Sequence, residues 1–285
     1  MKTQSYHINI AGINYHITAP DKIRLNRNLK CFLMKIKNAP KSDVKISIKY
    51  EEKIPLPDNI ISLDDHIKWA TDKTGEVSIC LSDENQVHSC LKTNKSWNNA
   101  LILANGKERR MNSHLQGALG EILFRNSILY HEGIVIHAAA IACNNKGIIF
   151  SAPSGTGKTT QANLWKKYKG AKIINADRPA IRIVEEKPYI YGTLWNGSSK
   201  ECTNTKVVLS MIVIVEQSPT NEIIRLSGKE AVAKVMPRCF LPYCTHESMD
   251  LALKNLERII GITPVYLLKC RPDKEAVELV NQCMI

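Results

Sequence analysis

Apolar and polar residues alternate along several short stretches of the first 110 positions. In the stretch 44–50, Val, Ile, Ile and Tyr alternate with Lys, Ser and Lys. A period of two predicts strands with one buried face and one solvated face. Similar stretches lie at 6–17, 76–81, 88–91 and 100–103, and turn-forming residues such as those at 55–59 separate them. The N-terminal region is therefore predicted to be rich in strands.

A helical period follows at 112–130, where apolar residues recur every three or four positions. Two apolar runs, 134–141 and 148–150, are then joined by Asn144-Asn145-Lys146-Gly147, which predicts a β-hairpin. Beyond it, strands are predicted at 173–174, 180–184, 207–215 and 265–268, and helices at 158–168, 227–236, 247–260 and 273–283. Gly170 is expected to end the first of these helices, and the capping-box pattern Ser227-x-x-Glu230 to begin the second.

Strands and helices that alternate in this way predict an α/β fold with a mixed sheet. We expect two regions: residues 1–110, strand-rich and a possible site of substrate binding, and residues 111–285, which carry the hairpin and the mixed sheet.

Composition narrows the class of protein. No segment approaches the ~20 apolar residues of a membrane span, and the first residues do not form an apolar secretory segment. A cytoplasmic protein without a membrane partner is expected. The nine cysteines are odd in number and lack a C-x-x-C pair. We therefore expect reduced, mostly buried thiols and no metal bound to cysteine.

The formal net charge of +12 calls for an acidic partner or a solvated basic surface. Aromatic residues make up only 6% of the chain, so the interleaved basic and aromatic pattern of single-strand nucleic-acid binders is missing. No nucleic-acid partner is expected. Binding of nucleotide phosphates or of an acidic peptide would explain the positive charge with fewer assumptions.

A glycine-rich segment follows the hairpin and leads directly into the predicted helix at 158–168. Such a loop binds phosphate through inward-turned backbone N–H groups and the positive end of the helix dipole. The predicted nucleotide-binding residues are Ser154, Gly155, Thr156, Gly157, Lys158, Thr159 and Thr160. Lys158 would reach the β- and γ-phosphates, and Thr159 would offer its hydroxyl to Mg²⁺. Ala152 replaces the usual first glycine, which is tolerable only at negative φ.

From His137 to about position 200 the sequence resembles the HPr kinase/phosphorylase superfamily, relatives of the phosphoenolpyruvate carboxykinases. Three elements in order carry the resemblance: His137 on the strand before the hairpin, the loop 154–159, and Asn175-Ala176-Asp177-Arg178-Pro179. The segment Gly192-Thr193-Leu194-Trp195-Asn196-Gly197 is similar to one in HPr kinase-like enzymes of ribosomal-peptide clusters, which phosphorylate a serine of a precursor such as a lasso peptide precursor.

This resemblance implies a P-loop kinase that uses ATP and Mg²⁺. Lys158 would be catalytic, Thr159 and Asp177 would hold the metal, and His137 and Arg178 would line the acceptor side. The acceptor would be a serine of a peptide or protein. Members of the family form symmetric assemblies, and a homo-oligomer stays open for this chain, as does the choice between ATP and GTP.

Two departures qualify the resemblance. The Glu-Arg-x-Gly-x-Gly segment of true HPr kinases is missing after the loop, which weakens HPr itself as the substrate. Ala176 also stands where the family carries its first aspartate, the expected base. Three interpretations follow: an engineered Asp-to-Ala variant, a naturally slow or pseudo-kinase, or a kinase in which His137 is the base. We favour the first, because every other element of the site is present.

Other functions and residue roles stay open. The chain could be a nucleotide-binding regulatory pseudo-kinase, or a small-molecule kinase acting on free serine. Asp177 could be a turn residue before Pro179, and His137 a packed core histidine. Two positive side chains, Arg178 and Lys200, could meet a phosphoryl group or solvent. Trp195 could lie in the core or line a substrate site. Cys239, Cys244 and His246 are better explained as buried thiols and a histidine than as a metal site.

Overall fold

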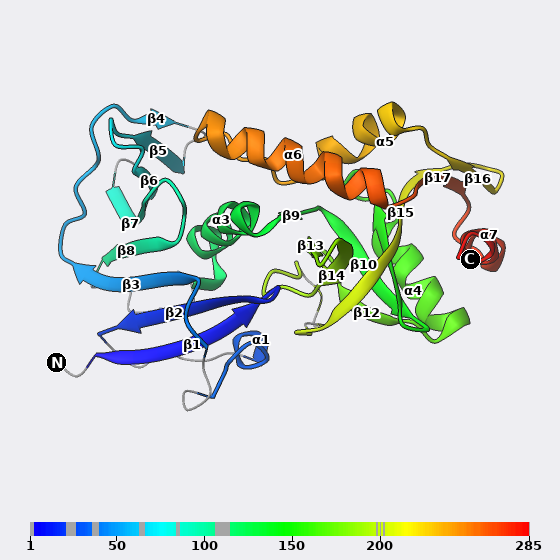
Figure 1. Ribbon diagram of the computed structural model, residues 1–285, viewed down its shortest axis with the longest axis horizontal. Coiled ribbons are helices and arrows are strands. Elements are labelled where there is room, and N and C mark those ends of the chain that lie inside the picture. Colours follow the sequence, from blue (N-terminus) through cyan, green and yellow to red (C-terminus); the bar gives the residue numbers. More distant parts are fainter. Residues whose placement is uncertain are drawn as a thin grey trace. The chain divides into compact units, whose positions relative to one another are not determined.

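A computed structural model describes residues 3–20, 27–35, 40–62, 66–83, 86–105, 115–197, 199, 201 and 203–284. The chain is a mixed α/β protein that divides into two compact units (Figure 1). One unit comprises residues 1–131 and 242–249, and the other comprises 132–241 and 250–285. Every helix that the structure describes is too short or too polar to cross a lipid bilayer.

Eight described strands form the mixed sheet of the first unit, in the order β1-β2-β3-β8-β7-β6-β5-β4. Strands β2, β3 and β8 are parallel neighbours, and the other pairs are antiparallel. The bounds are β1 Gln4–Ile10, β2 Ile13–Ala19, β3 Val44–Glu51, β4 Ile61–Ser62, β5 Ile67–Thr71, β6 Val77–Asp83, β7 Gln86–Thr93 and β8 Asn99–Asn105. The helical segments are α1 Arg27–Lys30, α3 Ala118–Ser127 and the 3₁₀ turn Ile128–His131.

The expectation of reduced thiols is wrong for one pair of cysteines. Cys80 of β6 and Cys90 of β7 form a disulfide. The two residues lie directly opposite each other in the antiparallel register, and both are fully buried. The pair was missed because strands at 76–81 and 88–91 were predicted without pairing them as a hairpin, and it is this local hairpin that brings the two thiols together. Six other cysteines of the described chain are free: Cys31, Cys143, Cys239, Cys244, Cys270 and Cys283.

The mixed sheet of the second unit follows the order β12-β10-β11-β15-β14-β13-β9, with β17 added beside β15 and β16 beside β17. The bounds are β9 Gly133–Val135, β10 Ala138–Cys143, β11 Lys146–Ser151, β12 Lys172–Asn175, β13 Ala180–Val184, β14 Lys187–Tyr191, β15 Lys206–Gln217, β16 Glu222–Arg225 and β17 Val265–Cys270. Helices α4 Lys158–Lys169, α5 Gly228–Val235, α6 His246–Ile262 and α7 Lys274–Gln282 accompany these strands, and a 3₁₀ turn spans Met236–Arg238.

Strand directions bring distant segments to one edge of this sheet. β11 and β12 are both antiparallel to β10, so they run in the same direction and end on the same side. β15 and β17 are parallel to β11 and to each other, and they end on that side too. β10 begins there, because Ala138 at its start pairs with Ser151 at the end of β11. The chain therefore places His137, the glycine loop and residues 176–178 along a single edge.

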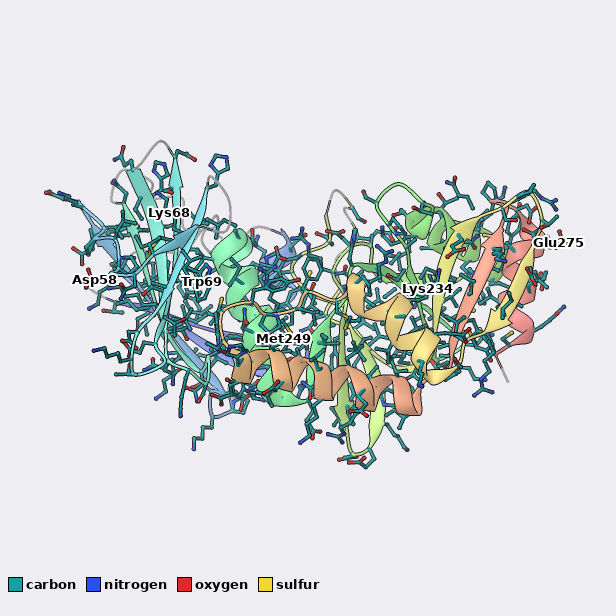
Figure 2. The ribbon with its side chains drawn as sticks, turned by 90° about the horizontal axis from the view of Figure 1, so that it is seen from above. Asp58, Lys68, Trp69, Lys234, Met249 and Glu275 are labelled. Carbon is teal, nitrogen blue, oxygen red and sulfur yellow. A yellow bond between two sulfur atoms is a disulfide. The ribbon has the colours of Figure 1, made fainter. Side chains whose placement is uncertain are left out.

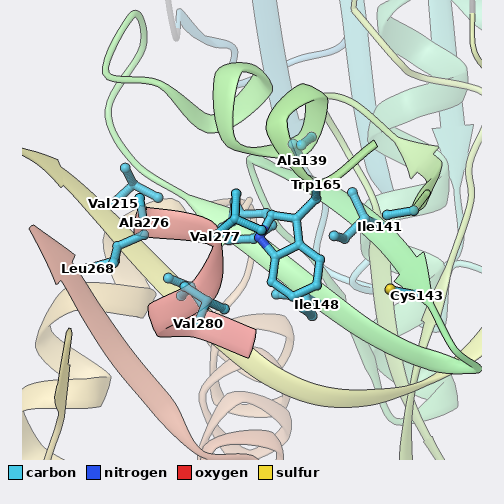
Figure 3. Packing of buried hydrophobic residues seen from close by; sticks show 14 of the residues in the cluster. Ala139, Ile141, Cys143, Ile148, Trp165, Val215, Leu268, Ala276, Val277 and Val280 are labelled. Carbon is cyan, nitrogen blue, oxygen red and sulfur yellow. The ribbon is translucent and has the colours of Figure 1, made fainter. Parts of the chain in front are cut away.

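A closely packed core fixes the helices that follow this edge. Trp165 of α4 is fully buried, and its ring centroid lies 6.2 Å from that of Phe150 on β11. Val277 and Val280 of α7 are buried in the same cluster (Figure 3). Burying an aromatic side chain stabilises a fold by about 1.5–3 kcal/mol, so α4 is anchored firmly to the sheet behind the glycine loop.

Local signals at the helix ends agree with the sequence. Gly170 ends α4 with φ 65°, the left-handed conformation that glycine adopts readily. Glu230 accepts a hydrogen bond from the backbone N–H of Ser227 at 2.9 Å, which confirms the predicted capping box of α5. Lys234 of this helix forms an ion pair with Glu216 of β15 (Figure 2).

Candidate functional site

The glycine loop begins where β11 ends and closes at the first turn of α4. Gly155 and Gly157 have φ values of 76° and 116°, which L side chains rarely adopt. Added Cβ atoms at these two positions would meet nothing within 4 Å. The glycines are therefore needed for backbone conformation rather than for space. Ala152 does not have a positive φ, so the alanine at the first loop position is not strained.

The N-terminus of α4 offers several backbone N–H groups at the loop. Its N-cap is Gly157, and no side chain caps the helix. The first turn of a helix leaves its N–H groups without intrahelical acceptors, and the helix dipole places partial positive charge there. The ammonium of Lys158 lies over this loop and donates to the carbonyls of Ala152 and Pro153 at 3.1 and 3.2 Å. Loop and lysine together form a cationic, donor-rich concavity.

Residues 175–178 turn sharply after β12 because Asn175 organises them. Its side-chain oxygen Oδ1 accepts from the backbone N–H groups of Asp177 and Arg178 at 2.9 and 2.7 Å. Its amide donates to the hydroxyl of Thr193 at 3.1 Å, and Asn175 is fully buried. The Thr193 hydroxyl in turn donates to the carbonyl of Arg178 at 2.7 Å. This network fixes the direction in which residue 177 leaves the sheet.

Asp177 lies between the His137 imidazole and the Arg178 guanidinium at the strand edge. Its carboxylate oxygens are 3.3 Å from Nε2 of His137 and 3.3 Å from Nε of Arg178. Gly197 packs against it, since an added Cβ at that position would lie 3.1 Å from the Asp177 carboxyl carbon. The glycine thus lets the segment after β14 approach the carboxylate closely.

His137 is held by the backbone on both sides. Its N–H donates to the carbonyl of Arg238 at 2.7 Å, and its carbonyl accepts from the hydroxyl of Ser151 at 2.8 Å. The imidazole ring lies 6.4 Å from the ring of Phe240, over which the guanidinium of Arg178 also lies at 5.4 Å. These backbone contacts direct the imidazole ring toward Asp177. About one third of the His137 side-chain surface remains exposed.

One cavity of about 480 Å³ joins most of the predicted residues. His137, Ser154, Gly155, Lys158, Thr159, Ala176 and Asp177 all line it, together with Asn196, Gly197 and Glu201. Thr156, Gly157 and Thr160 do not line this cavity but face another on the opposite side of the loop. Arg178 lies beside the cavity rather than in its wall, through its ion pair with Asp177. Lys200 is outside the described residues.

The electrostatic environment of the site favours an anion. Burial, and next the positive charge of Lys158, lower the pKa of His137, although Asp177 acts in the opposite direction. Burial also lowers the pKa of Lys158, against the stabilising charge of Asp177. Arg238 contributes to lowering both pKa values, so its positive charge is felt across the site. One carboxylate therefore faces several cationic groups.

Three residues with a role in this geometry were not among the site residues expected from the sequence. Asn175 and Thr193 shape the turn that carries Asp177, and Arg238 comes from a segment about 60 residues further along the chain. An asparagine directly after a strand and before an aspartate is a turn signal that could have identified the first. The tryptophan of the 192–197 segment, Trp195, is 7% exposed and belongs to the core. Burial raises the pKa of the Cys239 thiol to about 12, so this cysteine is protonated and unreactive.

Comparisons with known proteins give only distant structural likenesses. No protein-family model and no curated protein matches the chain. Among solved structures, it is similar to the Hpr(Ser) kinase/phosphatase from Coxiella burnetii, with 9% sequence identity and a TM-score of 0.30. The match covers 52% of this chain and 95% of that one.

Proposed function

We propose that the chain is a nucleotide-binding phosphotransferase of the HPr kinase-like type. Its reaction would transfer the γ-phosphoryl group of ATP, with Mg²⁺, to a hydroxyl, and the acceptor would be a serine of a precursor peptide, as in lasso peptide clusters. The second unit would carry the chemistry, and the strand-rich first unit would contribute to substrate binding. In this chain, Ala176 makes the transfer slow.

The observation that carries this proposal is the shared cavity. Lys158 and Thr159 from the loop, Asp177 from the end of the next strand and His137 from the connection between β9 and β10 line one cavity of about 480 Å³. These residues come from three separate segments that the sheet brings to one edge. Phosphoryl transfer needs mainly positioned cations and N–H donors around the phosphates, together with a group that receives the hydroxyl proton.

The residues fit the groups that the reaction requires. Positive φ at Gly155 and Gly157 lets the loop amides turn inward, and the uncapped N-terminus of α4 adds donors for phosphate oxygens. The hydroxyl of Thr159 and the carboxylate of Asp177 are oxygen ligands, which Mg²⁺ prefers. Bound Mg²⁺ would neutralise charge on the phosphates. To contact phosphate, the Lys158 ammonium would leave the two loop carbonyls that it now contacts.

With alanine at 176, His137 is the group placed to take the proton. Its lowered pKa keeps the imidazole neutral near pH 7, and Nε2 lies beside Asp177. The acceptor oxygen would form its bond to γ-phosphorus as the bond to the ADP oxygen breaks, and the hydroxyl proton would pass to the unprotonated ring nitrogen of His137. An aspartate at 176 would project from the same cavity wall and take over the role of base from His137.

Two other functions remain candidates for specific reasons. Ala176 itself favours a regulatory protein that binds nucleotide without transfer. The cavity of about 480 Å³ has room for a free amino acid, so a small-molecule kinase acting on free serine also fits the site.

A paired turnover assay tests the proposal. The chain and its Ala176→Asp variant would receive γ-labelled ATP and Mg²⁺ with either a serine-ended peptide or free serine. We expect the variant to transfer phosphate about 10²–10⁴-fold faster, since that is the usual contribution of a general base. Ala176→Asn is the matched control, because it has a similar volume without the carboxylate.

Transfer to the peptide alone would identify a peptide kinase, and transfer to serine alone a small-molecule kinase. Mg²⁺-dependent ATP binding without transfer by any of the three proteins would favour the regulatory function. A chain that binds neither ATP nor pyrophosphate would overturn the proposal.

A further inference from the structure

A second cavity of about 570 Å³ lies against the same loop. Gly155, Thr156 and Gly157 line it, as do Thr160 and Gln161 from the first turn of α4. In the sheet order β12-β10-β11-β15, Ala176 and Asp177 of the first cavity follow β12 on one side of the loop, whereas Val215 and Gln217 of the second belong to β15 on the other. The two cavities share Gly155 and flank the loop on opposite sides.

The far wall of this cavity is made by the ends of two parallel strands. β15 supplies Val215 and Gln217, and the turn after it supplies Ser218 and Pro219. β17 ends at Cys270, which is followed by Arg271 and Pro272. Ligands of α/β proteins bind beyond the carboxyl ends of parallel strands. The volume also lies within the range of about 300–1,000 Å³ that small-molecule sites occupy.

The guanidinium of Arg271 is fixed in place by three hydrogen bonds. Its Nε donates to Asp273 at 2.9 Å, one terminal nitrogen donates to the carbonyl of Pro219 at 2.9 Å, and the other donates to Glu275 at 2.9 Å. Glu275 stands at the start of α7 (Figure 2). Because all N–H bonds of a guanidinium lie in its plane, these acceptors surround its edge and leave its flat faces for stacking.

We propose that this second cavity binds the purine nucleoside of the nucleotide, with the base stacked on the face of Arg271. The inference rests on the proposed function, because it assumes that the loop holds the phosphates. The nucleotide would then extend from the Arg271 side across the loop, with its last phosphate entering the cavity of His137 and Asp177. The rigid rings of Pro219 and Pro272 would flank the base or ribose.

The alternative arrangement, with the nucleoside on the other side of the loop, fits the chemistry less well. The cavity there holds Lys158, Asp177, Ala176 and His137, so a nucleoside would occupy the space that the acceptor hydroxyl needs. The second cavity has no carboxylate in its wall, because Asp273 and Glu275 pair with Arg271 from outside it. In the second cavity, an electron-rich purine ring would contact the guanidinium of Arg271 rather than a group that transfers protons.

The test compares binding of ADP with binding of pyrophosphate, measured by calorimetry on the full chain. Pyrophosphate contacts the loop alone, whereas ADP contacts both the loop and the second cavity. We expect Arg271→Ala to weaken ADP binding about 3- to 30-fold, the usual range for a cation stacked on a ring. Pyrophosphate binding is expected to change by less than about twofold.

Two further variants control for effects on the fold. Arg271→Lys keeps a cation near Asp273 and Glu275 but lacks the flat face, so it should weaken ADP binding almost as much as alanine. Arg258→Ala removes an arginine that is also paired with two glutamates, Glu132 and Glu186, but lies away from the loop. It should leave both ligands bound as in the original chain.

The outcomes separate this inference from the proposed function. Weaker ADP binding with unchanged pyrophosphate binding supports the nucleoside site. If ADP and pyrophosphate weaken equally, or ADP does not weaken at all, the nucleoside lies elsewhere although the loop still binds phosphate. If the original chain binds neither ligand, the proposed function fails, and this inference fails with it.

Discussion

At the scale of single residues, the site combines one carboxylate with a histidine whose charge depends on its surroundings. His137 is partly buried and close to Lys158, and both effects lower its pKa below the ordinary value of 6.5. Asp177 offsets part of this effect without reversing it. The imidazole is therefore neutral at pH 7, which is the state that a proton acceptor requires.

A pH profile follows from this direction. Residual phosphoryl transfer by the chain should be level above pH 6.5 and fall as the pH drops through the lowered pKa of His137, because protonation removes the base. His137→Gln should abolish this residual transfer. The fall in rate at low pH, the acid limb of the profile, would then no longer be measurable in that variant. Single-turnover rates between pH 5 and 8 would reveal the profile. An NMR titration of the His137 ring provides a readout independent of activity.

The Ala176→Asp variant is the natural control for this profile. Its carboxylate would take over the base role, so its acid limb should move to lower pH, toward the ordinary range of an aspartate. An acid limb that stays in place in both proteins, or that survives His137→Gln, would contradict the role given to His137.

At the scale of elements, the loop and α4 act as one unit because the conformation of the loop sets the start of the helix. Gly157 is the N-cap of α4 and has φ 116°. A side chain at this position would be strained even though the surrounding space is open. Glycine is therefore required at position 157 for its backbone conformation. That conformation also sets the direction of the backbone N–H groups in the loop.

Gly157→Ala should consequently weaken both the fold and the binding of phosphate. Left-handed conformations cost L residues about 1–2 kcal/mol, and we expect a loss of this size in the free energy of unfolding. Pyrophosphate affinity should fall as well, because relief of the strain would turn the loop amides away. Urea unfolding and calorimetry measure the two effects.

Gly228 of α5 provides the matched control. It also has open space around an added Cβ, but its φ is not positive. Gly228→Ala should therefore change the free energy of unfolding by less than about 0.5 kcal/mol. Equal effects of the two substitutions would show that loss of glycine, rather than backbone conformation, matters at Gly157.

Local sequence patterns predicted which segments form helices and strands better than they predicted which segments pack together. The periodicity of 44–50 and 207–215 corresponds to β3 and β15, and the helix predicted at 158–168 corresponds to α4. The short strands β4, β5, β14 and β16 were not predicted, although β12 and β13, which have four and five residues, were. Segments this short carry a weak periodic signal. Among site residues, the loop carries a local motif. Asn175, Thr193 and Arg238 act through contacts that exist only once the sheet has formed.

At the scale of the whole molecule, the composition and hydrophobic periodicity of the sequence gave no sign that residues 242–249 group with the N-terminal unit. This grouping has no local signature, because it depends on tertiary contacts such as the hydrogen bond from the Thr71 hydroxyl to the carbonyl of Cys244. Each unit has its own sheet. The stability of the first unit can therefore be changed while nucleotide binding by the second unit is measured.

The disulfide allows that separation to be measured. Cys80 and Cys90 are 10 residues apart, and closing a loop of this size stabilises a fold by about 2–3 kcal/mol through the entropy of the unfolded chain. Replacing both residues by alanine should reduce hydrogen-exchange protection in β6 and β7 by a corresponding amount. Protection in β11 and β15 should stay nearly unchanged, as should the affinity for ADP, because every residue proposed to bind nucleotide lies in the second unit. Equal losses of protection in both sheets would show instead that the two units unfold as one cooperative structure. The first unit would then contribute directly to the stability of the nucleotide site.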